Sequence, residues 1–250
     1  MTRMAVTRAQ AQSFDRLAAD YGKLGELGGN AGVDSWLKTA LPQVGDRALD
    51  LGCGAGRHTV LLAERFAHVD AIDLSGPMIE LATATRSRPN IAYRQCDLHD
   101  FAGQARYDLV VSVLTLHHVA DLHVALSQIR TLLAPGGRAV VVDTYDPQPE
   151  QPSLWWRFRL AAETVLPVRL RLHCLSLLRL SSRTVRLGPS AAWRIYRLST
   201  KRAWLDHLVS DRPFSRDALR SSCEVLFPGC RLDRLGGPRM IGVVWDAPDG

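Results

Sequence analysis

The feature that most constrains this chain is a repeated alternation of strand-like and helix-like patterns between residues 45 and 146. Short apolar runs typical of buried strands are separated by segments whose apolar residues recur with a helical period. Strands are expected at residues 47–52, 69–75, 90–97, 107–119 and 138–145. Helices are expected between them at residues 59–66, 76–86 and 122–134, the last stopped by the Pro-Gly-Gly at 135–137. This alternation predicts an α/β fold with a doubly wound parallel sheet and right-handed crossovers.

The segments that flank this core have their own patterns. Apolar side chains recur at helical spacing near the N-terminus at Phe14, Leu17, Ala18 and Tyr21. A second helix is expected from Trp36, capped by Asp34 or Ser35. The C-terminal part predicts a helix capped by Ser215, followed by two strands around a turn at residues 236–238.

These patterns predict one domain over residues 1–250. Its four parts are an N-terminal helical lid at 1–44, a βα core at 45–146, a basic helical insertion at 147–205, and a closing helix with two strands at 206–250. The insertion follows a Pro-rich connection and is both very apolar and very basic.

Charge is distributed unevenly along the chain, whose net charge is +6. Residues 1–146 hold 14 Lys and Arg against 16 Asp and Glu, whereas residues 147–250 hold 17 against 9. Between Trp155 and Trp204 there are 11 basic residues and one acid, Glu163. This asymmetry predicts a surface of functional importance in the insertion without naming its partner.

Composition also bears on the compartment. No window holds the ~18 uninterrupted apolar residues of a membrane span, and the first residues lack the apolar stretch of a secretory signal. The five cysteines are scattered without a C-x-x-C pair, which argues against a disulfide scaffold and a zinc site. We therefore expect a cytoplasmic protein.

The turn after the first predicted strand reads LDLGCGAGRH over residues 49–58 and has three glycines at alternate positions. Glycine leaves backbone N–H groups unshielded by a Cβ, and ligands of open parallel sheets bind beyond the carboxyl ends of the strands. A dinucleotide is disfavoured because its G-x-G-x-x-G fingerprint needs glycine at the position of Arg57. The G-x-G-x-G spacing favours a smaller, less anionic ligand.

Carboxylates end the next two predicted strands. Asp73 lies 23 positions after Asp50, where an acid can accept both hydroxyls of a ribose. Asp97 ends the third strand and could accept the exocyclic amine of a purine. Structural alternatives are a helix cap for Asp73 and a solvated strand end for Asp97.

Five motifs occur in a characteristic order and spacing: LDLGCGAGRHT, AIDLS, QCDL, YDLVVSVLTLHHV and LLAPGGRAVV. The chain therefore resembles the class I S-adenosylmethionine-dependent methyltransferases, especially the type 11 group that includes ubiquinone and menaquinone biosynthesis enzymes. The resemblance covers about residues 45–145. It implies a Rossmann-like, seven-stranded, mostly parallel sheet with an antiparallel last strand and a helical cap after strand five.

The resemblance implies S-adenosyl-L-methionine as cofactor and a set of residues that bind it. The expected residues are Tyr21, Asp50, Gly52, Cys53, Gly54, Gly56, Asp73, Leu74, Met78, Asp97, Leu98 and Ser112. The three glycines would hold the methionine part, and Asp50 would support their turn and, through water, the cofactor's ammonium group. Asp73 would bind the ribose hydroxyls.

The remaining members of the set have expected roles around the adenine and the sulfonium. Leu74 and Met78 would flank the adenine, and Asp97 would accept its amine beside the backbone of Leu98. Ser112 would face the sulfonium, and Tyr21 would act as a lid over the cofactor.

Two histidines directly after the fourth strand, His117 and His118, are the candidate catalytic residues. Methyl transfer depends mainly on alignment of the acceptor, and a general base is needed only where the acceptor must lose a proton. Relatives that methylate a phenol-type oxygen have a Glu-His pair here that can hold a metal. Because His117 replaces the Glu, we predict no metal site. A structural role in the following helix is the alternative for both histidines.

The insertion supports several interpretations, and three classes of function stay open. The insertion could form a lid over an apolar acceptor, a peripheral membrane contact for a lipid or quinone, or a surface that binds nucleic acid. The fourth interpretation is a solvated face that binds no partner. The favoured function is methyl transfer to a small, apolar or natural-product-like acceptor. Methylation of RNA or of a lipid or quinone at a membrane, and a non-catalytic binding module, are the others.

Overall fold

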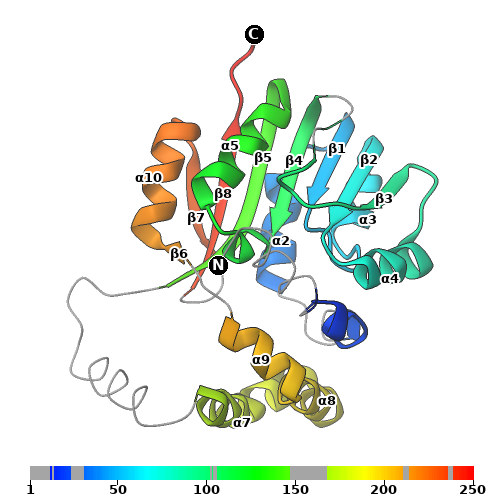
Figure 1. Ribbon diagram of the computed structural model, residues 1–250, viewed down its shortest axis with the longest axis vertical. Coiled ribbons are helices and arrows are strands. Elements are labelled where there is room, and N and C mark those ends of the chain that lie inside the picture. The colour runs from blue at the N-terminus through cyan, green and yellow to red at the C-terminus, as the bar shows by residue number, and fades with distance from the viewer. Residues whose placement is uncertain are drawn as a thin grey trace. The chain divides into compact units, whose positions relative to one another are not determined.

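The computed structural model describes residues 12, 14–23, 31–101, 103, 106–146, 168–210, 214–235 and 239–250 (Figure 1). By their contacts the residues separate into two compact units. The core unit comprises residues 1–18, 30–147 and 212–250, and the insertion unit comprises residues 19–29 and 148–211. The insertion unit therefore overlaps the helical insertion predicted at 147–205 and also includes a stretch near the N-terminus.

A single sheet forms the centre of the core unit, with the strand order β3-β2-β1-β4-β5-β8-β7. Its strands are β1 (Gly45–Leu51), β2 (Phe66–Asp73), β3 (Ile91–Gln95), β4 (Tyr107–Val113), β5 (Leu133–Asp146), β7 (Arg231–Leu235) and β8 (Met240–Asp246). Strands β1 to β5 pair in parallel, and β8 runs antiparallel to β5 and β7. A short strand, β6 (Phe214–Ser215), pairs with the end of β5. The predicted seven-stranded sheet with an antiparallel last strand is confirmed, and β6 is an addition to it.

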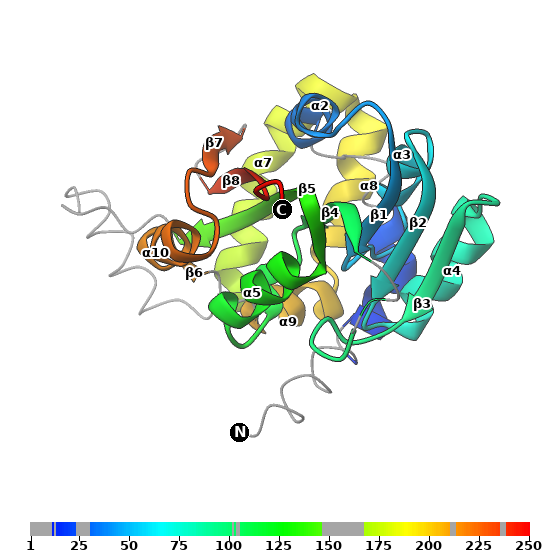
Figure 2. The same ribbon diagram turned by 90° about the horizontal axis from the view of Figure 1, so that it is seen from above.

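Helices cover both faces of this sheet, which explains the continuous apolar runs of its central strands. One face packs against α5 (Leu122–Leu132) and α10 (Arg216–Leu226). The other packs against α2 (Ala31–Ala40) and α3 (Thr59–Ala63). Figure 2 shows α5 and α10 on one side of the strands and α2 on the other. The fold is therefore doubly wound, as the alternating pattern predicted.

Three of the described helices, α4, α5 and α10, begin at a local side-chain cap. In α4 (Gly76–Arg86) the Ser75 hydroxyl accepts the Met78 N–H, and a proline occupies the first turn. In α10 the Ser215 hydroxyl accepts the Ala218 N–H, so the predicted cap is confirmed.

Strand β5 begins at Leu133, earlier than the predicted start at residue 138. Two boundaries beside the candidate site were wrong for tertiary reasons. Helix α2 begins at Ala31 and not at Trp36, because the Asp34 carboxylate binds the Arg57 guanidinium at 2.6 Å instead of capping the helix. Strand β4 ends at Val113, earlier than predicted, because Leu114 has a left-handed φ of 56°. These departures lie beside the candidate site.

The insertion unit is helical throughout its described part. It contains α7 (Val168–Leu187), α8 (Pro189–Ser199) and α9 (Arg202–Ser210). The end of a helix over residues 14–23 also belongs to it, where Asp20 accepts Lys201 Nζ at 2.8 Å. Residues 147–167 of the predicted helical insertion lie outside the described residues. Among the described helices, none combines the length and the apolarity that a membrane crossing requires.

Candidate active site

The turn that follows β1 is fastened to β2 and α4 by its backbone. The Ile72 carbonyl accepts the N–H groups of Gly52 and Cys53, at 2.8 and 2.9 Å. The Gly56 N–H closes the turn on the Cys53 carbonyl at 2.9 Å. From α4, Arg86 Nη1 donates to the Ala55 carbonyl at 2.8 Å. The turn is therefore a fixed shape, which suits a backbone that binds a ligand.

The three positions of this turn require glycine for different structural reasons. All three have positive φ values, between 51° and 79°. A Cβ on Gly52 would lie 2.2 Å from the Thr115 hydroxyl, and one on Gly56 would lie 2.6 Å from the Tyr93 hydroxyl. A Cβ on Gly54 would meet nothing within 4 Å. Gly54 is thus the position where a ligand can approach the bare backbone, whereas Gly52 and Gly56 serve close packing.

Asp73, at the end of β2, receives backbone donors on both carboxylate oxygens. Its Oδ2 accepts the Gly54 N–H at 2.8 Å, and its Oδ1 accepts the Ser75 N–H at 2.9 Å. A carboxylate has about four lone-pair sites, so these donors do not use all of its acceptor positions. Burial raises the pKa of Asp73 above its usual range, although these backbone donors oppose the shift. The arrangement matches the vicinal hydroxyl pair of a ribose.

Asp50, inside the turn at the end of β1, is a buried carboxylate. It is 2% exposed, and its Oδ2 accepts the Thr59 hydroxyl at 2.6 Å. Burial, with a smaller contribution from the neighbouring Asp73 charge, raises the pKa of Asp50 to about 7. Two carboxylates therefore lie close together under the glycine turn, and a positively charged ligand would favour the ionised form of both.

Asp97 and its neighbours lie at the end of β3. Asp97 Oδ1 accepts the His99 N–H at 2.9 Å, so the side chain shapes its own loop. Leu98 is buried, Leu74 is half-buried, and Met78 is only 1% exposed. Met78 is thus covered by protein on the inner face of α4.

Two further predicted residues turn toward the protein. The Ser112 hydroxyl donates to the Leu51 carbonyl at 3.2 Å and is buried. Cys53 is also buried, and burial raises the pKa of its thiol well above the usual value. A neutral thiol at that position is a packing group, not a nucleophile.

The N-terminal helix contributes two contacts at this edge of the core unit. The Ser75 hydroxyl donates to Asp15 Oδ1 at 2.6 Å, and the Phe14 ring contacts the His118 ring edge-on at 4.9 Å. Tyr21 lies in the insertion unit, where its ring is 5.8 Å from that of Trp204. Its role as a lid over a cofactor stays a prediction.

The two histidines lie in a short 3-10 helix, η1 (Leu116–His118), with their ring centroids 3.8 Å apart. His117 Nδ1 is 2.6 Å from Asp143 Oδ1, and its side chain is 9% exposed. Asp143 Oδ2 also accepts the N–H groups of Leu116 and His117, at 2.7 and 3.2 Å. This carboxylate therefore fixes both the start of η1 and the orientation of the His117 ring. Among the described residues, no group of three or more metal-binding side chains is arranged to hold a metal ion.

Sequence reasoning missed three residues of this region: Asp143, Leu114 and Asp15. Asp143 ends the apolar run of β5 with a charge that is 1% exposed, and a buried acid in such a run was the available signal. Leu114 gave no signal, because nothing about a leucine in a sequence indicates a left-handed φ. Asp15 acts through a contact with Ser75 that the local pattern does not contain.

A sheet of this order, with a glycine turn after β1 and a carboxylate at the end of β2, defines the class I methyltransferase fold. Residues 49–141 match the family described as Methyltransferase domain. The resemblance drawn from the five motifs is thus confirmed over these residues, which match a methyltransferase domain.

Individual relatives agree with this class. An uncharacterised methyltransferase of Mycobacterium tuberculosis is 33% identical over 119 residues, which are 47% of this chain and 60% of that protein. The ubiquinone biosynthesis O-methyltransferase of Aeromonas salmonicida is 36% identical over 110 residues, 42% of this chain and 46% of that protein. A solved structure of DhpI with SAH superposes with a TM-score of 0.63 at 18% identity and covers 99% of each chain. The chain thus spans about half the length of the two sequence relatives.

Proposed function

We propose that this protein transfers a methyl group from S-adenosylmethionine to a small acceptor. The observation that supports it most is the pairing of an open glycine backbone with a buried carboxylate, Asp50, and a half-buried one, Asp73. Gly54 has free space where a Cβ would project, and Asp50 and Asp73 lie beside it with raised pKa values. Such a site favours a ligand with a cationic amino-acid tail and a ribose.

The residues present fit this cofactor by charge. The contacts described for Asp50 and Asp73 are with hydroxyl and backbone N–H groups, not with a Lys or Arg side chain. A bound ammonium and sulfonium would supply the missing positive charge and lower both pKa values. A dinucleotide would bring a pyrophosphate next to the same carboxylates, which is unfavourable.

The cofactor supplies an activated methyl group on a charged sulfur, so the protein's contribution is alignment of the acceptor. His117 is the residue that can also remove a proton. An ionised Asp143 only accepts hydrogen bonds, so Nδ1 of neutral His117 carries the ring hydrogen and Nε2 is the ring's acceptor. We propose His117, with its ring oriented by Asp143, as the general base for an acceptor hydroxyl or protonated amine.

We infer a small acceptor, apolar or natural-product-like, that presents a hydroxyl group. A general base held by a carboxylate is useful for oxygen acceptors, which must lose a proton as they react. The name of one relative, an O-methyltransferase of ubiquinone biosynthesis, supports the same choice.

Calorimetry with S-adenosylmethionine tests the cofactor site directly. Asp73→Ala removes two charge-assisted hydrogen bonds worth about 1.5–3 kcal/mol each, so we expect at least ~100-fold weaker binding. Asp108→Ala is the matched control, because Asp108 also accepts two backbone N–H groups, from Asp46 and Arg47, but lies at the start of β4. Equal affinity of the Asp73 variant and the wild type would remove this residue from the site. No binding by the wild type at millimolar cofactor would overturn the proposed function.

A lipid or quinone acceptor at a membrane surface is the second candidate. Helix α7 exposes Leu170, Leu177 and Val185, the last at 88%. Residues 168–199 contain seven Arg and no Asp or Glu. Co-sedimentation with vesicles of 30% anionic lipid, compared with neutral vesicles and with RNA, tests this. Binding only to the anionic vesicles, lost in Val185→Asp, supports the candidate, and binding to RNA alone favours the nucleic-acid alternative.

A non-catalytic binding module predicts a different result from either enzyme. It would bind S-adenosylmethionine without transferring the methyl group to any acceptor. Transfer of tritium from methyl-labelled cofactor to a panel of phenols, carboxylates and quinols separates the two.

A further inference from the structure

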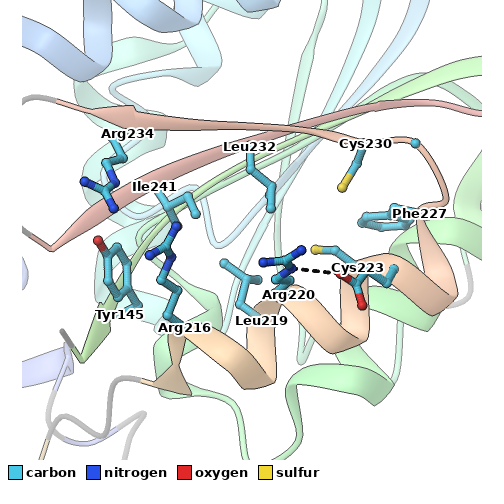
Figure 3. A pocket seen from close by; sticks show the side chains of 12 residues that line it. Tyr145, Arg216, Leu219, Arg220, Cys223, Phe227, Cys230, Leu232, Arg234 and Ile241 are labelled. Carbon is cyan, nitrogen blue, oxygen red and sulfur yellow. Dashed lines mark hydrogen bonds and ion pairs between the residues drawn. The ribbon is translucent and has the colours of Figure 1, made fainter. Parts of the chain in front are cut away.

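A second concave site lies in the core unit between α10 and the strands β5, β7 and β8. It is a cavity of about 340 Å³ whose lining includes Tyr145, Arg216, Leu219, Cys223, Arg234 and Ile241 (Figure 3). Its size is within the range of small-molecule sites. None of its lining residues belongs to the glycine turn or to η1, so it is separate from the site proposed above.

One end of the cavity is polar and positively charged. Figure 3 shows the Tyr145 hydroxyl and the guanidinium groups of Arg216 and Arg234 gathered there. They come from three segments: the end of β5, the first residue of α10 and the penultimate residue of β7. The Tyr145 side chain is only 7% exposed, so its ring is fixed in the core while its hydroxyl faces the cavity.

The charge at this end is not balanced by the lining. Glu224 is the single carboxylate among the described lining residues, and its Oε1 accepts Arg220 Nε at 2.8 Å. Neither Arg216 nor Arg234 forms an ion pair with any residue that the structure describes. Two neighbouring guanidinium groups without a counter-charge favour the binding of an anion.

The rest of the cavity is apolar. Leu219, Phe227 and Ile241 are 1%, 0% and 5% exposed and form its wall. Cys223 is also buried there, and burial raises the pKa of its thiol to about 12, so the sulfur is uncharged at neutral pH. A ligand that fills the cavity therefore needs an apolar body behind its charged head.

We propose that this cavity binds a small amphipathic anion, a carboxylate or phosphate on an apolar body. Arg216 and Arg234 hold the head group, because the planar guanidinium matches both oxyanions with paired hydrogen bonds. The Tyr145 hydroxyl donates a further hydrogen bond, and the body lies along Leu219 and Ile241. The site requires neither the cofactor nor methyl transfer, so it stands independently of the proposed function.

Calorimetry of the cofactor-free protein tests the site with three probes: 4-phenylbutyrate, phenyl phosphate and the neutral 4-phenyl-1-butanol. We expect at least one anion to bind about tenfold or more tightly than the alcohol, as expected for loss of one charge-assisted hydrogen bond. Preference for one of the two anions identifies the head group. Added salt should weaken binding of the anion and leave binding of the alcohol unchanged.

Substitutions place the binding in this cavity. Arg216→Gln and Arg234→Gln should each weaken binding of the anion about tenfold. Tyr145→Phe keeps the ring and should reduce the affinity for the anion less. Arg220→Gln is the matched control, because Arg220 lines the same cavity but is paired with Glu224. The affinity of this variant for the anion should stay within about twofold of the wild type. Equal binding of alcohol and anion, unchanged affinity in both Gln variants, or no binding of either anion at millimolar concentration would overturn the proposal. Arg216 and Arg234 are exposed, so these variants should fold, and thermal unfolding verifies this.

Discussion

Two neighbouring strands at the centre of the sheet end in sharp turns that are built in different ways. After β1 the chain turns at Gly52, with φ 73°, and after β4 it turns at Leu114, with φ 56°. The first turn is held by the backbone, because the Ile72 carbonyl accepts two of its N–H groups. The second is held by a buried side chain, because the Asp143 carboxylate accepts N–H groups of η1 and the His117 ring.

The difference separates the cofactor half of the proposed site from its acceptor half. Glycines and a local hydrogen-bond pattern define the first turn, so its shape depends little on the rest of the chain. The second turn depends on one distant carboxylate and on a strained residue, so it can differ between proteins that share the first. The two halves meet where the Thr115 side chain packs against Gly52.

The largest effect is expected at the acceptor half. His117→Ala should lower kcat by about 10²–10⁴-fold, the usual contribution of a general base, and leave cofactor affinity unchanged. Asp143→Asn should also lower kcat, and it should shift the acidic limb of the pH–rate profile to lower pH, because the ring loses the carboxylate that favours its protonated form. Tritium transfer from labelled cofactor measures both.

His123→Ala is the control for these variants, because His123 is an exposed histidine on α5. A His117 variant with full turnover would show that this half of the site acts by alignment alone. Unchanged pH dependence in Asp143→Asn would limit Asp143 to a structural role.

The cofactor half should respond differently at two of its glycines. Gly52→Ala combines a left-handed φ, at about 1–2 kcal/mol, with a clash against Thr115, at about 1–3 kcal/mol. Gly54→Ala has only the cost of the left-handed φ, because its Cβ would enter open space. That Cβ would, however, occupy the space proposed for the cofactor. We therefore expect Gly52→Ala to lower the free energy of unfolding more, and Gly54→Ala to weaken S-adenosylmethionine more. Urea unfolding and calorimetry on both variants measure this, and the opposite ranking in either would contradict it.

Cofactor affinity should rise with pH, because burial raises the pKa of Asp50 to about 7 and the cationic ligand favours its ionised form. The dissociation constant should fall by up to tenfold per pH unit as pH rises through about 6–7, then level off. Calorimetry below pH 7 should also detect proton release. Asp50→Asn should flatten the dependence, and a pH-independent affinity in the wild type would contradict this account.

The same raised pKa has the opposite consequence for the free protein. Because the folded state holds the proton more tightly, Asp50 stabilises the fold fully below its unfolded pKa of about 4, and this contribution is lost as pH rises toward about 7. Added cofactor should therefore raise the unfolding temperature more at pH 8 than at pH 5.

The sequence predicted the sheet, its alternating helices and the glycine turn, because these depend on local periodicity and on residues such as Gly54 and Ser215. It did not predict the roles of Asp143 and Asp15, which act through partners far along the chain, His117 and Ser75. Positions alone also could not separate Gly52, a packing residue, from Gly54, a residue that faces open space. Ser112 was expected to face the ligand by its place at the end of β4, yet its hydroxyl donates to a neighbouring strand.

The smallest effect is expected at Leu114, where strain should be measurable without loss of the fold. A leucine with φ 56° costs about 1–2 kcal/mol, whereas asparagine tolerates this region because its short polar side chain bonds locally. Leu114→Asn should therefore be more stable than Leu114→Ala by about 1 kcal/mol, since both lose the same half-buried side chain but only Asn relieves the strain. If the strain at Leu114 helps Asp143 to position η1, Leu114→Asn should keep the stability of the fold but lose turnover. Unfolding and kinetic measurements on the two variants test both expectations. Equal stability of the two variants would show that the turn after β4 is held by Asp143 alone.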